Sequence, residues 1–136
     1  MKAIYISIKP VHLNRIISGE KTYEFRNYIP KDGVDTLFVY ESSPVCELRY
    51  VIKVGKIIEY PNKILKKGIG NEEFNKGEKN SKYAYEIKDV YRLEKFISLK
   101  KLREKYDFNP PQAYSYSKKY PKLTNYIMNS IKKPKI

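Results

Sequence analysis

Residues 19–26 read GEKTYEFR, and they carry the most informative pattern in the chain. From position 23 on, aromatic and charged residues alternate, so an extended strand would turn its two aromatic rings to one face and Glu24 and Arg26 to the other. Lys21 stands between the end of a preceding helix and the start of this strand, from where its side chain can swing across the strand end. The pattern predicts a strand with an aromatic face and a face that carries one anion and two cations.

Hydrophobic alternation and chain breakers place the other elements around this strand. Pro10 can open a helix and Gly19 can end it, because proline needs no N–H donor in a first turn and glycine accepts a left-handed backbone. Strands are expected at 2–9, 21–26, 36–40, 48–54 with an extension to 57–58, and 83–93, helices from 10 to the stop at 19 and over 99–106 and 120–131, and short helices with loops over 61–82. We therefore expect a mixed α+β fold, a small β-barrel of five or six short strands decorated by short helices and a C-terminal helix.

Length and composition indicate one globular domain without a membrane segment. The chain has 136 residues, of which 41% are hydrophobic and 32% charged. Its apolar runs are only a few residues long, against the roughly 18 that a membrane span needs. The first ten residues alternate and lack the apolar core of a signal peptide. We expect a single domain over 1–131, a frayed tail over 132–136, and a cytoplasmic protein with no membrane partner.

The only cysteine and the only histidine argue against metal chemistry. Cys46 has no second thiol to pair with, and together with His12 it is too little for a zinc site. The sequence neighbours of Cys46 include Glu47 and no cation that would activate a thiolate. We expect Cys46 to be a buried structural residue, His12 to lie on a helix surface, and the protein to need neither a metal nor a cofactor.

The net charge of +13 is unevenly distributed along the chain. Lysine outnumbers arginine 23 to 5, which is typical of AT-rich genomes, so part of the charge reflects codon usage. Residues 1–60 carry nine basic and seven acidic side chains, whereas residues 61–136 carry nineteen and eight. A basic half attracts polyanions through their phosphates, and Lys118 and Lys119 are candidate phosphate contacts. The alternative is a protein–protein adaptor whose charge is codon bias alone.

Spacing by itself leaves two readings of Lys21, Glu24 and Arg26 open. They are either an ordinary solvated strand face with a weak ion pair or a polar ligand site. The motif Gly19-x-Lys21-x-x-Glu24-x-Arg26 after a short helix resembles the signature of the ASCH family, a branch of the PUA-like β-barrels. Three further segments in the same order resemble its longer members, namely SIKP at 7–10, YESSPV at 40–45 and PPQAY at 110–114. The resemblance covers most of the chain, is weakest over 61–82, and favours the ligand site.

The resemblance implies a PUA-like pseudo-barrel with a cleft between the 21–26 strand, the 42–44 loop and the helix after the first strand. It also implies a module that binds RNA or a modified nucleoside and serves as a regulator of transcription or translation. The residue types agree with binding, since Glu24 can accept from an exocyclic amine, Arg26 offers a fork of donors, and Gln112 can read a base edge. The expected ligand-binding residues are Lys9, Lys21, Glu24, Arg26, Ser43 and Gln112.

Some small relatives in this family are amidohydrolases that deacylate N4-acetylcytidine with a threonine nucleophile three residues after the motif lysine. This chain has Glu24 at that place, so we do not expect that mechanism. The alternative function is a metal-independent hydrolase of an acylated nucleoside or an RNA phosphodiester, with Glu24 as general base and Lys21 as electrostatic stabiliser. The sequence leaves the ligand, the choice between RNA and DNA, and the oligomeric state open.

Overall fold

A single six-stranded sheet organises the molecule, in the strand order β2-β5-β4-β3-β1-β6. The computed structural model describes residues 1–131, so the tail predicted at 132–136 lies outside the described residues. The strands are β1 (Ala3–Ile8), β2 (Tyr23–Arg26), β3 (Thr36–Glu41), β4 (Glu47–Glu59), β5 (Tyr83–Ser98) and β6 (Ser115–Tyr116). The helices are α1 (Pro10–Ile17), α2 (Asn71–Asn75), α3 (Leu99–Tyr106), α4 (Pro121–Ser130) and a 3₁₀ turn, η1 (Ser117–Lys119).

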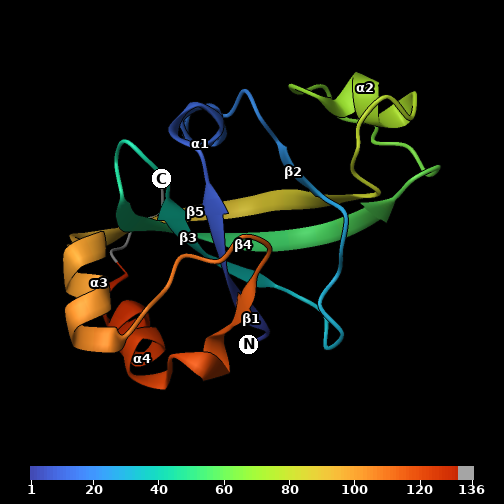
Figure 1. Cartoon of the computed structure of the whole chain (residues 1–136). Helices are drawn as coiled ribbons and strands as arrows, with labels where there is room; N and C mark the ends of the chain where they lie inside the picture. Colours follow the sequence, from blue (N-terminus) through green and yellow to red (C-terminus); the bar gives the residue numbers. More distant parts are fainter. Residues whose placement is uncertain (132–136) are drawn as a thin grey trace.

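The sheet is mixed and curls into a half-barrel (Figure 1). β1 and β3 run parallel, and every other neighbouring pair of strands is antiparallel. The ladder between β4 and β5 shifts register at three places, and such irregularities increase the local twist and bend of a strand pair. The predicted mixed α+β fold with a small barrel-like sheet and a C-terminal helix is thereby confirmed.

Two strands are longer than the sequence pattern predicted. β4 has 13 residues and β5 has 16, so these strands are not short, and β5 runs on to Ser98 rather than ending near Leu93. Each register shift interrupts the alternation of buried and exposed residues, which is why the pattern seemed to end early. β6 was not predicted, because two residues are too few to show any alternation.

The sheet buries a hydrophobic cluster on each face. On one face, Tyr5 and Phe38 pack with residues of α3, of α4 and of the segment between them. On the other face, Ile4 and Ile6 pack against α1. Successive residues of β1 therefore supply opposite faces, as the alternation at positions 2–9 predicted. Figure 1 shows α3 and α4 together at one side of the sheet and α1 at another.

The connection from α1 into β2 confirms the predicted helix boundaries. Pro10 occupies the start of α1, and Gly19 follows its end with a φ of +85°. This left-handed conformation reverses the chain, so that the N–H of Lys21 donates to the carbonyl of Arg15 at 2.9 Å. The reversal sets the start of β2 beside the last turn of α1 and orients the Lys21 side chain.

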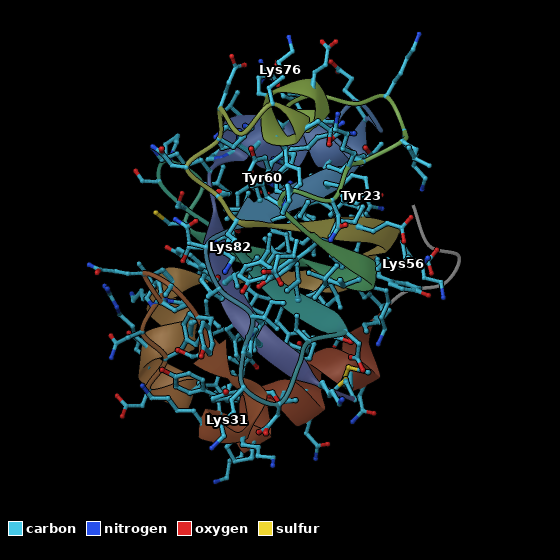
Figure 2. The ribbon with its side chains drawn as sticks, turned by 90° about the vertical axis from the view of Figure 1, so that its right-hand side faces the viewer. Tyr23, Lys31, Lys56, Tyr60, Lys76 and Lys82 are labelled. Atoms are coloured by element: carbon cyan, nitrogen blue, oxygen red, sulfur yellow. The ribbon has the colours of Figure 1, made fainter. Side chains whose placement is uncertain are left out.

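The segment 61–82 forms one short helix, α2, over the outer face of β2. Phe74 of α2 stacks on Phe25 with ring centroids 5.7 Å apart, and Tyr60 meets Phe74 edge-on at 6.2 Å. Figure 2 shows Tyr60 below α2, and Figure 1 shows α2 at the opposite end of the sheet from α3 and α4. Within residues 1–131, no helix has the length and apolar character needed to cross a membrane.

Candidate functional site

Glu24 lies between two cations in the interior of the curled sheet. Its Oε2 accepts from Arg26 Nη2 at 2.7 Å and from Arg26 Nε at 3.0 Å, and its Oε1 lies 3.3 Å from Lys21 Nζ. Lys21 and Glu24 are only 7% and 6% exposed. The charged face predicted for residues 21–26 is therefore a buried ion-pair cluster rather than a solvated strand face.

The strand alternation of β2 positions this cluster. Tyr23 and Phe25 point outward and join the hydrophobic cluster under α2. Glu24 and Arg26 point the other way, and Glu24 stands opposite Tyr85 in the antiparallel ladder with β5. The hydroxyl of Tyr85 donates to the carbonyl of Tyr28, and burial raises the pKa of Tyr85 well above its usual value.

Arg26 also connects β2 to β1. Its Nη2 donates to the carbonyl of Ser7 at 3.2 Å, and its Nη1 donates to the hydroxyl of Tyr28 at a long 3.5 Å. Ser7 and Tyr28 in turn donate from their hydroxyls to the carbonyls of Pro111 at 2.8 Å and Ala113 at 2.9 Å. The arginine thus sits at the centre of a network that joins three distant parts of the chain.

This network places the exposed Gln112 next to the ion-pair cluster. Pro111 and Ala113, the two neighbours of Gln112, are the residues held by Ser7 and Tyr28. The ring of the following residue, Tyr114, packs on the ring of Tyr28 with centroids 4.8 Å apart. The segment that carries Gln112 is therefore anchored on both sides, while Gln112 itself is exposed.

The electrostatics of the cluster favour a ligand with negative or electron-rich groups. One carboxylate shared by two cations leaves a net positive charge in a poorly solvated place. Burial lowers the pKa of Lys21, and the adjacent Glu24 carboxylate partly offsets this by favouring the ammonium form. Since both Arg26 contacts go to Oε2, Oε1 has only the longer contact to Lys21 and retains capacity to accept from a ligand donor.

Comparison of the sequence with protein-family models shows which family the chain belongs to. The model of the ASCH domain family matches residues 6–135, nearly the whole chain. The chain belongs to the ASCH domain family. No curated protein matches this ASCH domain closely enough to count as a relative.

Solved structures with the same fold come from Zymomonas mobilis. The ASCH protein of that organism is 23% identical, covers 91% of this chain and 94% of its own, and superposes with a TM-score of 0.68. A tyrosine-to-phenylalanine mutant of it, 22% identical, covers 92% and 98% with a TM-score of 0.68, and a serine-to-alanine mutant, 23% identical, covers 92% and 96% with 0.67. At this identity the likeness establishes the fold alone.

Lys9 and Ser43 lie near the same end of β1 as Ser7 but open onto the surface. Both residues are exposed and line a depression together with Pro10, Val11, Ser42 and Pro44. The N–H of Ser42 donates to the carbonyl of Ile8 at 3.0 Å, which holds this loop against the end of β1. The ASCH domain thus presents Lys9 and Ser43 as an outer rim, separate from the buried Lys21–Glu24–Arg26 cluster.

Lys118 and Lys119 lie at the other end of β1. They are the last two residues of η1, which directly follows β6, and Tyr116 of β6 pairs with Ile4 near the start of β1. Both lysines are exposed, and Lys118 lines a depression with residues 1–3. These lysines therefore follow a strand that pairs with the start of β1, whereas Arg26 contacts Ser7 near the end of β1.

Sequence reasoning missed Tyr28, which links Arg26 to the segment around Gln112. Tyr28 follows Arg26 by two residues, so continuing the alternation of residues 24 and 26 would have suggested it. Thr22, the other nearby hydroxyl, accepts from Asn71 Nδ2 at 3.1 Å and is occupied by the α2 segment.

His12 and Cys46, the only histidine and cysteine, lie in different parts of the fold. His12 is exposed on α1, as predicted, whereas Cys46, directly before β4, is half-buried against the core and so less buried than predicted. No group of three or more histidine, cysteine, aspartate or glutamate side chains within residues 1–131 could hold a metal ion.

Proposed function

We propose that this ASCH domain binds RNA or a modified nucleoside at the Lys21–Glu24–Arg26 cluster. The observation that carries the proposal is the difference between the two carboxylate oxygens of Glu24. Oε2 accepts two hydrogen bonds from Arg26, whereas Oε1 has only a 3.3 Å contact with Lys21 Nζ. Oε1 can then accept from an exocyclic amine, as glutamate does with cytosine N4. Lys21 stands beside it to donate to a ring carbonyl or nitrogen, which gives the paired donor and acceptor that a base edge requires.

The surrounding residues fit the remaining parts of a nucleic-acid ligand. Gln112, on its anchored segment, can read a second edge with one donor and one acceptor. Lys9 and Ser43 on the rim can contact the sugar or a phosphate, and Lys118 and Lys119 the phosphates of a longer RNA. DNA is the alternative polymer. We propose that the protein acts in the cytoplasm as a regulator of transcription or translation, and that it does so by binding nucleic acid rather than by catalysis.

A thermal-shift series tests the proposal. The protein is screened against nucleosides, modified nucleosides including N4-acetylcytidine, and short RNAs at low and moderate salt. A ligand at about one hundred times its dissociation constant stabilises the fold by roughly 2.7 kcal/mol, which is easily measured. We expect at least one nucleoside or short RNA to give a shift that survives moderate salt.

Arg26→Lys locates the site in the same series. The variant keeps the charge but loses the fork that orients Glu24, so its ligand affinity should fall by about tenfold. Arg92→Lys, at an exposed position of β5, is the matched control and should bind as the parent does. Equal affinity of all three proteins would remove the cluster from the binding site.

Catalysis remains the second candidate, because Lys21 and Glu24 are adjacent and buried. Arg26 holds Oε2 of Glu24 at 2.7 Å, however, so only Oε1 would be left to act as a general base. Turnover of N4-acetylcytidine or cleavage of an RNA ladder that disappears in Glu24→Gln would establish the hydrolase instead of the binding module.

A further inference from the structure

Two lysine side chains from distant parts of the chain meet at one aromatic ring beside the cluster. Lys21 Nζ lies 4.8 Å from the centroid of the Phe25 ring, and Lys79 Nζ lies 4.6 Å from the same centroid. Lys79 comes from the segment after α2, where the resemblance to the family is weakest. None of the ion pairs within residues 1–131 includes Lys79, whereas Lys21 has Glu24 as its partner.

Gly70 makes room for this arrangement. It has a φ of +85°, and a Cβ at this position would lie 2.8 Å from Phe25 Cε2 and 2.9 Å from Lys79 Cε. The backbone at Gly70 therefore packs closely against both the Phe25 ring and the aliphatic part of Lys79, and a larger residue at this position would displace them. Lys79 is half-buried and held along a defined path rather than extended into solvent.

Charged groups of α1 lie close enough to Lys21 and Lys79 to interact with them electrostatically. His12 and Arg15 lie on α1, and the pKa of His12 is lowered first by partial burial and then by the positive charge of Lys21, with smaller contributions from Arg15 and Lys79. Lys79 in turn contributes to the lowered pKa of Lys21, after the larger effect of burial. Of the described groups that act on the pKa values of His12 and Lys21, Glu24 is acidic, whereas Arg15, Arg26 and Lys79 are cationic.

Like charges held close together repel one another, and cation–π attraction to one ring compensates only in part. Since the two ammonium nitrogens lie 4.8 and 4.6 Å from one ring centroid, an anion beside that ring and within reach of both would relieve the repulsion and accept charge-assisted hydrogen bonds from them. Lys21 already stands next to the Glu24 oxygen that we assign to a base amine. A base at Glu24 and an anion at Lys79 would therefore share one lysine.

We propose that Lys21 and Lys79 bind a phosphate group beside Glu24, so that the ligand is a nucleotide, free or within an RNA, rather than a neutral nucleoside. The inference rests on the proposed function for the base, but the phosphate contact can be measured by itself. It assigns a ligand-binding role to the α2 segment, which delivers Lys79 to the end of β2.

The experiment compares four ligands by calorimetry: cytidine, cytidine 5′-monophosphate, cytidine 3′-monophosphate and the dinucleotide CpC. Inorganic phosphate is a fifth, base-free probe. We expect at least one phosphate-carrying ligand to bind about tenfold more tightly than cytidine. Tightest binding of a monophosphate would indicate a free nucleotide, and tightest binding of CpC would indicate a phosphodiester within RNA.

Lys79→Gln tests the residue, and Lys76→Gln is its matched control. Both changes remove one lysine charge from the α2 segment, but Lys76 is exposed and lies at the outer end of the molecule in Figure 2. We expect Lys79→Gln to bring the phosphate-carrying ligands down to the affinity of cytidine, and Lys76→Gln to keep the parental ratio.

The outcomes separate this inference from the proposed function. Phosphate-carrying ligands that bind no more tightly than cytidine, or equal losses in Lys79→Gln and Lys76→Gln, would overturn the phosphate subsite while leaving base recognition intact. Binding of inorganic phosphate that depends on Lys79, together with no binding of cytidine or any other nucleoside, would support the subsite and refute base recognition at Glu24.

Discussion

Arg26 grips Glu24 through a single carboxylate oxygen, with Nη2 at 2.7 Å and Nε at 3.0 Å from Oε2. The two residues stand two positions apart on β2, so strand alternation alone brings them to one face. These two hydrogen bonds fix the orientation of the Glu24 carboxylate, whose Oε1 then faces Lys21. The start of β2 thus holds a carboxylate acceptor and two cationic donors side by side.

The ion-pair cluster should contribute to the stability of the fold. Glu24→Ala leaves Lys21 and Arg26 poorly solvated without a counter-charge, and we expect the free energy of unfolding to fall by about 3 kcal/mol. Chemical denaturation measures the loss. Glu104→Ala, at an exposed position of α3, should change stability by less than about 0.5 kcal/mol, and equal midpoints for the two variants would contradict a buried, paired Glu24.

Stability should fall at alkaline pH because of buried tyrosines. Burial raises the pKa of Tyr5 far above that of a free tyrosine, and burial raises the pKa of Tyr40 to about 12. Above about pH 10 the unfolded chain releases these protons and the folded chain does not, so each tyrosine costs up to about 1.4 kcal/mol per pH unit until its folded pKa is reached.

Tyr5→Phe tests this pH dependence. Loss of the 2.9 Å hydrogen bond between Tyr5 and Thr124 should cost about 1 kcal/mol at neutral pH, while the decline between about pH 10 and 12 becomes shallower. Denaturant unfolding at a series of pH values provides the measurement. The exposed Tyr60→Phe should retain the parental decline, and a parental slope in Tyr5→Phe would argue against the pKa shift.

Two glycines with the same backbone conformation should differ in their tolerance of a side chain. Gly19 and Gly70 both have a φ of +85°, but a Cβ at Gly19 meets nothing within 4 Å, whereas at Gly70 it would overlap Phe25 and Lys79. Gly19→Ala should cost about 1 kcal/mol from the left-handed backbone alone. Gly70→Ala should cost at least about 1 kcal/mol more, because the neighbours must move, and equal losses of stability would show that the packing at Gly70 is loose.

Lys118 and Lys119 should bind RNA phosphates without regard to base sequence. Lys118→Glu combined with Lys119→Glu replaces two exposed positive charges by negative ones, so affinity for all single-stranded RNAs should fall alike. Loss of two phosphate contacts should decrease the salt dependence, as a logarithmic slope, by about 1.4. Binding titrations at several salt concentrations test this. The control is Lys100→Glu combined with Lys101→Glu on α3, and the same decrease in both double variants would mean that only the total charge matters.

Several features could be predicted from the sequence because they depend on local geometry. Side-chain direction in a strand repeats every two residues, so residues 23–26 by themselves determined that Glu24 and Arg26 oppose the two aromatic rings. Pro10 and Gly19 determined the ends of α1, since one fixes φ and the other permits a left-handed turn. The helix at 99–106 was likewise correct to the residue.

Other features were decided only by the tertiary structure, because they depend on contacts between residues far apart in the chain. The hydrogen bond from Ser7 to Pro111 spans 104 positions, and it is this contact that brings Gln112 beside Arg26. The length of β5 depends on its pairing with β4, and the position of Lys79 depends on how α2 packs against Phe25. Local alternation set which side chains of β2 face inward, whereas long-range packing of the sheet and the α2 segment decided which residues they meet there.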